Sequence, residues 1–112
     1  MNSEDLRDDC FQNILTALFR TSGFRWRKAK QYPDDPRNMR ASEACKLMAT
    51  NAAELPDDCW EILESLYDPD SKGWRDALCQ ATNNVGFSNK SNSFSFFLRN
   101  LISLLPQPQV VA

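Results

Sequence analysis

β-branched side chains, which favour strands, are scarce in this chain. Valine, isoleucine and threonine together number only ten of its 112 residues, and two of the valines lie in the last three positions. Alternation of apolar and polar residues is nearly absent, and the one exception, Ser93 to Phe96, runs directly into apolar residues at helical spacing. We therefore expect an all-α protein.

The size and composition of the chain are typical of one globular domain, with 42% hydrophobic and 25% charged residues. A chain of this length buries about two-thirds of its unfolded surface, so its fold needs neither a metal nor a disulfide. We expect a single-domain bundle of about five helices over residues 1–105, with antiparallel neighbours and short loops. Residues 106–112 are expected to form a flexible tail.

Gly23 predicts where the first helix ends. A helix over Ser3 to Thr21 carries an apolar stripe that Phe19 widens, and Gly23 can adopt the left-handed conformation that ends many helices. The stripe consists of Leu6, Cys10, Ile14 and Ala17 or Leu18. Phe24 would then contact Phe19, as the corresponding residues do in a Schellman motif. The same pair recurs as Gly86-Phe87, which an internal duplication would also explain, although the surrounding residues match poorly.

Capping and stop residues place the other helices. Asp35 and Pro36 suit the start of the second helix, as N-cap and first helical residue, and Pro56 should stop it after Glu54. The later helices are expected at about 57–67, from the turn at 68–71 to Val85, and at 93–105, with longer connections at 22–34 and 87–92.

The third helix has a possible capping box. Asp58 precedes Glu61 by three residues, which predicts Asp58 as the cap.

Charge is strongly segregated along the chain, although the net charge is only −2. Residues 1–19 carry four acids and one cation, and residues 55–76 carry seven acids and two cations. Residues 20–32 carry five cations and no acid, and no acid follows position 76. Opposite-signed faces of this kind can steer a charged partner or a second copy of the chain.

The basic segment also carries aromatic residues, the combination that binds single-stranded nucleic acid by stacking and phosphate contact. The alternative, which the acidic pI of 5.0 favours, is that Phe24 and Trp26 fold back into the core while the cations stay hydrated or pair with the acidic third and fourth helices. The candidate binding surface consists of Arg20, Arg25, Trp26, Arg27, Lys28, Lys30 and Tyr32.

Catalytic and metal-binding patterns are weak. There is no histidine, which removes the commonest general base and metal ligand. The paired acids Asp34-Asp35 and Asp57-Asp58 fit helix starts, and Asp8-Asp9 lies on a helix where adjacent side chains diverge. The segment from Asp68 to Gly73 opens like a calcium loop but has Lys72 at a ligand position, so we expect a turn. No cofactor is expected.

Four cysteines, at 10, 45, 59 and 79, form no Cys-x-x-Cys pair. We expect all four to be reduced and at least three to be buried, because Cys10, Cys45 and Cys79 share stripes with core residues and Cys59 adjoins Trp60. A disulfide or a reactive thiol is the alternative, and a cysteine-dependent enzyme would have to use a carboxylate or lysine as base.

The fifth helix is apolar on most of its circumference, yet its twelve residues from Phe94 to Leu105 are too few to span a bilayer. It is either the central helix of the bundle or exposed on one side for a partner. We expect a homodimer slightly more than a monomer, with Phe96 and Leu104 as candidate contacts.

These patterns predict a cytoplasmic, non-enzymatic protein that acts through protein–protein interaction, as an adaptor, inhibitor or regulatory subunit. The alternative is a nucleic-acid-binding accessory protein that uses residues 20–32. A cytoplasmic location is expected because the N-terminal residues are acidic where a signal peptide would be basic and then apolar, and no membrane association is expected because the longest apolar stretch is too short to span a bilayer.

Overall fold

The computed structural model describes residues 3–52, 55–85 and 93–106. That part of the chain forms five α-helices and contains no strand, so the predicted all-α bundle is confirmed. The helices are α1 (Ser3–Gln31), α2 (Pro36–Thr50), α3 (Asp57–Leu66), α4 (Lys72–Asn84) and α5 (Phe94–Leu104). Within these ranges, no helix has the length and apolar character needed to cross a membrane.

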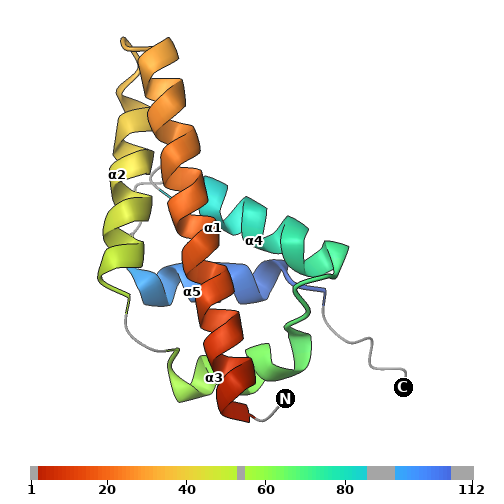
Figure 1. Ribbon diagram of the computed structural model, residues 1–112. Coiled ribbons are helices and arrows are strands. Elements are labelled where there is room, and N and C mark those ends of the chain that lie inside the picture. The colour runs from red at the N-terminus through yellow and green to blue at the C-terminus, as the bar shows by residue number, and fades with distance from the viewer. Residues whose placement is uncertain (1–2, 53–54, 86–92, 107–112) are drawn as a thin grey trace.

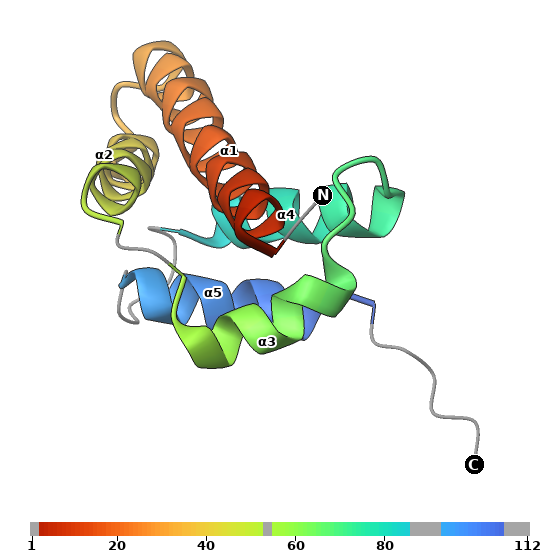
Figure 2. The same cartoon turned by 60° about the horizontal axis from the view of Figure 1, so that its bottom comes forward.

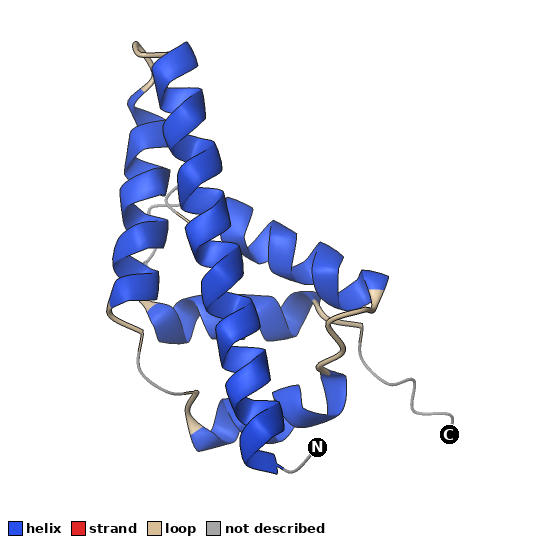
Figure 3. Ribbon diagram, in the orientation of Figure 1, coloured by secondary structure: helices blue, strands red, loops and turns tan. Residues whose placement is uncertain are grey.

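The long helix α1 runs through the molecule, which measures 50 × 31 × 25 Å. Its second half and the antiparallel α2 form a hairpin, residues 19–51, which projects at one end (Figure 1). Its first half crosses α3, α4 and α5, and we call these four segments the body. α4 and α5 run antiparallel, whereas α3 and α5 lie side by side in the same direction (Figure 2). Only a short loop joins the two helices of the hairpin (Figure 3).

Large apolar side chains fill the body. Cys10, Ile14 and Leu18 follow one another at four-residue spacing and are fully buried, so they form the stripe that α1 presents to the other helices. The indole of Trp74 is buried beside it and donates a hydrogen bond from Nε1 to Asn13 Oδ1 at 2.8 Å. Other buried residues of the body include Trp60, Leu63, Ala77, Phe97, Leu98 and Leu101.

The helix starts follow local chemistry. Asp35 caps α2 as predicted, because its Oδ1 accepts the N–H of Arg37 at 3.0 Å, and Pro36 is the first helical residue. Ser71 and Ser93 cap α4 and α5, where their hydroxyl oxygens accept the N–H groups of Trp74 and Phe96. Polar side chains in the sequence therefore fix three of the five helix starts.

Two predicted helix ends are wrong. α2 ends at Thr50, before Glu54, and the N–H of Asn51 bonds back to carbonyl oxygens of the last turn. The N-cap of α3 is Pro56, with no side-chain cap, so Asp58 does not form the predicted capping box. The reason is that α3 begins at Asp57, which places Asp58 inside the first helical turn, and an N-cap residue has to precede that turn.

The prediction that the first helix ends before Gly23 is also wrong, because α1 continues to Gln31. Packing against α2 explains the difference. The Ser22 hydroxyl donates to the carbonyl oxygen of Ser42 at 2.8 Å, and the Ser42 hydroxyl donates to the carbonyl oxygen of Ser22 at 2.8 Å. The hydrogen bonds and packing between α1 and α2, which we call the seam of the hairpin, outweigh the cost of a glycine inside a helix, which is about 1 kcal/mol. The expected connection at 22–34 is therefore mostly helix, and Phe24 is not a capping residue.

The cysteines are free, and three of the four are buried as predicted. Burial raises the pKa of the Cys10 thiol to about 12 and that of Cys45 to about 11. Cys79 is exposed, so its predicted place in the core is wrong. It directly follows the buried Leu78, and one residue further along a helix turns a side chain away from the buried stripe.

Some predictions fall outside the described residues. These are the Gly86-Phe87 pair, the connection at 87–92 and all of the predicted tail except Pro106, which follows α5.

Candidate interaction surface

The predicted binding segment, residues 20–32, is the end of α1 and the first residue after it. Helical geometry therefore separates its side chains onto different sides. The side chains exposed on the outside of the hairpin belong to Arg20, Trp26, Arg27 and Lys30. Lys28 and Tyr32 lie on a flank of the helix, together with Phe24. Arg25 lies on the inner side.

Arg25 joins three helices. Its Nη1 donates to Asn38 Oδ1 in α2 and its Nη2 donates to Asn83 Oδ1 in α4, each at 3.3 Å. Beside it, the Thr21 hydroxyl donates to the Thr82 hydroxyl of α4 at 2.9 Å. Arg25 therefore fixes the hairpin on the body and does not belong to the outward surface that the sequence predicted.

The aromatic residues of this segment do not fold back into the core, so that expectation is wrong. Phe19, Phe24, Trp26 and Tyr32 are each between 41% and 57% exposed. The sequence predicts Phe19 on the buried side of α1, and its exposure shows that this prediction is wrong. The body covers this flank of α1 only at Phe11 and Leu15, which pack against the core.

The cations of the segment do not pair with the acids of α3 or α4, so of the two expected arrangements the pairing is wrong, whereas Arg20, Arg27 and Lys30 are exposed to solvent. The ion pairs among residues 3–52, 55–85 and 93–106 are Arg7 to Asp57, Arg37 to Asp35, and Lys72 to Asp76.

Two lysines lie over aromatic rings instead. Lys30 Nζ is 5.0 Å from the centroid of the Trp26 ring. Lys28 Nζ lies between two rings, 5.6 Å from the centroid of Phe24 and 5.9 Å from that of Tyr32. Contacts of this kind contribute about 0.5–1 kcal/mol each at exposed sites.

The outside of the hairpin carries two parallel rows of side chains. Phe19 and Trp26 form one row, and Arg20 and Arg27 form the other. Residues seven apart are separated by two helical turns, or about 10.5 Å. Gly23 lies between the rows. We call this surface the aromatic–basic face, and it consists of Phe19, Arg20, Gly23, Trp26, Arg27 and Lys30.

Gly23 leaves a gap in the aromatic–basic face. A Cβ atom at this position would have only Arg27 Nη1 near it, at 3.7 Å, so packing does not require a glycine here. Sequence reasoning missed Gly23 and Phe19 as members of the face. Continuing the helical period through Gly23 would have found both, because Phe19 and Trp26 are two turns apart.

The charge of the hairpin is opposite to that of the rest of the chain. Residues 19–51 contain eight cations and three acids, whereas the remaining residues contain five cations and twelve acids. The aromatic–basic face thus belongs to a projecting, positively charged end of the molecule (Figure 1).

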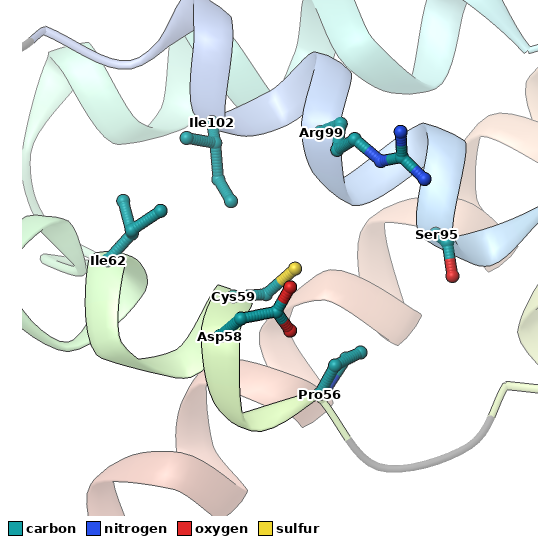
Figure 4. Close-up of a pocket in the computed structure, with 7 residues that line it drawn as sticks. All are labelled: Pro56, Asp58, Cys59, Ile62, Ser95, Arg99 and Ile102. Carbon is teal, nitrogen blue, oxygen red and sulfur yellow. The ribbon is translucent and has the colours of Figure 1, made fainter.

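A concave surface, separate from the aromatic–basic face, lies between α3 and α5. It is a cavity of about 370 Å³ whose lining includes Asp58, Cys59 and Ile62 of α3 and Arg99 and Ile102 of α5. The Cys59 thiol and the Asp58 carboxylate point into the gap between the helices (Figure 4). Burial and the neighbouring Asp58 raise the pKa of Cys59, and Arg99 lowers it. The balance keeps the thiol protonated, so it is a weak nucleophile.

α5 is covered on one side only. Phe97, Leu98 and Leu101 are buried, and the helix contacts both α3 and α4. Its outer side carries Ser95, Arg99 and Ser103. Of the two candidate oligomer contacts, Phe96 is 38% exposed and Leu104 is partly buried against the core. Little apolar surface therefore remains on α5 for a partner.

The calcium-like segment forms the predicted turn between α3 and α4. The N–H of Asp70 donates to Asp68 Oδ1 at 3.1 Å, and the N–H of Ser71 donates to the carbonyl oxygen of Asp68 at 3.0 Å. Across the described ranges, no group of three or more acidic or cysteine side chains is arranged to hold a metal ion.

Comparison of the chain with protein-family models, curated proteins and solved structures gives no match. The function is therefore inferred from this chain's own residues.

Proposed function

We propose that this protein is a non-enzymatic binding protein, an adaptor, inhibitor or regulatory subunit, and that the aromatic–basic face contacts its protein partner. The observation that carries the proposal is the exposure of Phe19 and Trp26 beside cations that have no acidic partner among the described residues. Aromatic and arginine side chains are enriched in the energetic centres of protein interfaces.

Three features favour a protein partner over a nucleic acid. One face of the Trp26, Phe24 and Tyr32 rings is occupied by a lysine, which a stacking base would have to displace. The two rows repeat every seven residues, which matches the repeat of a partner helix. The net charge of −2 is also unusual for a nucleic-acid-binding domain.

Capture of partners with matched variants tests the proposal. Trp26→Ala/Arg27→Ala removes one ring and one cation from the aromatic–basic face. Arg40→Ala/Leu47→Ala removes one cation and one exposed apolar side chain from the outer side of α2 and serves as control. We expect the wild type and the control to retain the same protein from a lysate of the native host and the first variant to lose it. Equal retention by all three would contradict the proposal.

Nucleic-acid binding remains the second candidate, because the outward cations are free to contact phosphates. Titration of labelled single-stranded DNA and RNA at low salt tests it. If Arg20, Arg27 and Lys30 contact phosphates, replacing all three with alanine should reduce the salt dependence of binding by about 0.7 per lost contact on logarithmic axes. We expect no such binding by the wild type.

A further inference from the structure

The outer side of α3 is acidic and partly apolar. Asp58, Glu61 and Glu64 are exposed and make no ion pair within the described part of the chain, where Asp57 alone of the α3 acids has one, with Arg7 at 3.5 Å. Ile62 is 44% exposed and lies beside Asp58 at the edge of α3 that borders the cavity with α5. The outward surface, which we call the acidic face, consists of Asp57, Glu61 and Glu64, and Ile62 lies at its edge.

α3 carries the acidic face at one end of the molecule, whereas the aromatic–basic face extends from the middle of α1 toward the opposite end (Figure 1). α1 is 29 residues long and separates the end of the hairpin from α3. The two faces of one chain therefore cannot contact each other while the fold is intact. Two copies in opposite orientation, however, can bring each aromatic–basic face to the acidic face of the other copy.

We propose that a second copy of this chain binds the aromatic–basic face through its acidic face. The proposal rests on the function proposed above and names the partner. The contact would occur twice around a two-fold axis, which closes the assembly as a dimer. The small net charge of −2 per chain gives little overall repulsion between copies, so the local attraction decides the association.

The spacing of the two faces is compatible. Arg20 and Arg27 are two turns apart on α1, and Asp57 and Glu64 are two turns apart on α3, with Glu61 on the same side. Helices that lie alongside each other can therefore place both arginines against acids. On α1, Gly23 lies between the two rows and allows close approach of the helix backbone of the second copy.

Sedimentation equilibrium at micromolar concentration tests the proposal. We expect a dimer at about 0.1 M salt and dissociation at about 1 M, where the Debye length falls from about 10 Å to about 3 Å. Arg20→Glu/Arg27→Glu and Glu61→Lys/Glu64→Lys should each weaken self-association more than about tenfold, because like charges would meet at both contacts. Arg40→Glu/Lys46→Glu, which changes the charge equally on α2, should leave it unchanged.

An equimolar mixture of the two disrupted variants is the decisive measurement. In a mixed dimer, one contact places new glutamates against new lysines and the other keeps the original charges. We therefore expect the mixture to form a heterodimer of near wild-type affinity although each variant alone is monomeric. This result also excludes misfolding as the cause of the disruption.

Three results would overturn the proposal: a wild-type monomer at low salt, a mixture that does not associate, or a control variant that is disrupted as strongly as the others. None of these three results contradicts the proposed function. That proposal is contradicted only if capture of the partner does not depend on the aromatic–basic face. Species larger than a dimer would contradict the two-fold arrangement.

Discussion

The body and the hairpin are built from similar helices but bury opposite kinds of side chain. In the body, Trp60 and Trp74 lie in the core with leucines around them. In the hairpin, small residues such as Ser22, Ala29 and Ala41 form the buried seam, and the aromatic rings are outside. Small side chains let two helices approach closely, which leaves no room for a ring between them.

The comparison shows that aromatic residues do not mark the core in every part of a chain. In the body, where four helix segments converge, large side chains fill the space between them. Where only two helices meet, the outer half of each helix remains open to solvent. The exposed rings of the hairpin are therefore available for binding, and those of the body stabilise the fold.

The largest expected effect is the difference in stability loss between replacing a leucine of the body and replacing a leucine of the hairpin with alanine. Leu98→Ala, at a fully buried position of the body, should lower the free energy of unfolding by about 3 kcal/mol, because it leaves a cavity. Leu47 in the hairpin is 64% exposed, so Leu47→Ala should change the free energy of unfolding by less than about 0.5 kcal/mol. Urea unfolding of both variants measures the contrast, and similar losses would show that the hairpin has a core of its own.

The seam of the hairpin should be sensitive to added volume. Ala41 is fully buried against α1, so Ala41→Leu should force the helices apart and cost about 2 kcal/mol. Glu43→Leu adds a leucine to the exposed side of the same helix and is the control. Thermal unfolding compares them. Tolerance of Ala41→Leu would mean that the close approach of α1 and α2 is not required.

Gly23→Ala should stabilise the hairpin. The added Cβ meets no atom closer than 3.7 Å, and alanine is favoured over glycine inside a helix by about 1 kcal/mol. An increase in melting temperature, with weaker self-association in the same variant, would show that the gap serves binding and not folding. A decrease in melting temperature would show instead that the helix needs a glycine at this point.

The smallest effect is the pH dependence of the cap of α2. Hydrogen bonds from the Arg37 side chain and its backbone N–H lower the pKa of Asp35 from 3.8 to about 2. Because the pKa of Asp35 is lower in the folded protein, the ionised carboxylate stabilises the fold above pH 3.8, the ordinary pKa. This stabilisation disappears as the pH falls through the lowered pKa. Asp35→Ala should therefore reduce the melting temperature at neutral pH, have a much smaller effect near pH 2, where the carboxyl group is about half protonated, and have almost none near pH 1. An undiminished difference near pH 1 would show that something other than the carboxylate charge causes it.

Local features of the sequence were sufficient for much of the fold. The scarcity of β-branched residues predicted the all-α class, and Asp35 with Pro36 located the start of α2. The stripe of Cys10, Ile14 and Leu18 predicted the buried side of α1 in the body. These features act within one or two helical turns, so they can be recognised in the sequence without knowing where the neighbouring helices lie.

The candidate surface was only partly predictable. The clustering of cations and aromatic residues along the sequence identified the segment, but it could not show that Arg25 lies inward, that Phe19 lies outward or that Gly23 is helical. Those outcomes depend on where α2 and α4 lie. The reciprocal hydrogen bonds between Ser22 and Ser42 hold α2 against α1. This packing stabilises α1 as a continuous helix through Gly23 and covers one of its sides, so the opposite side of α1 remains exposed.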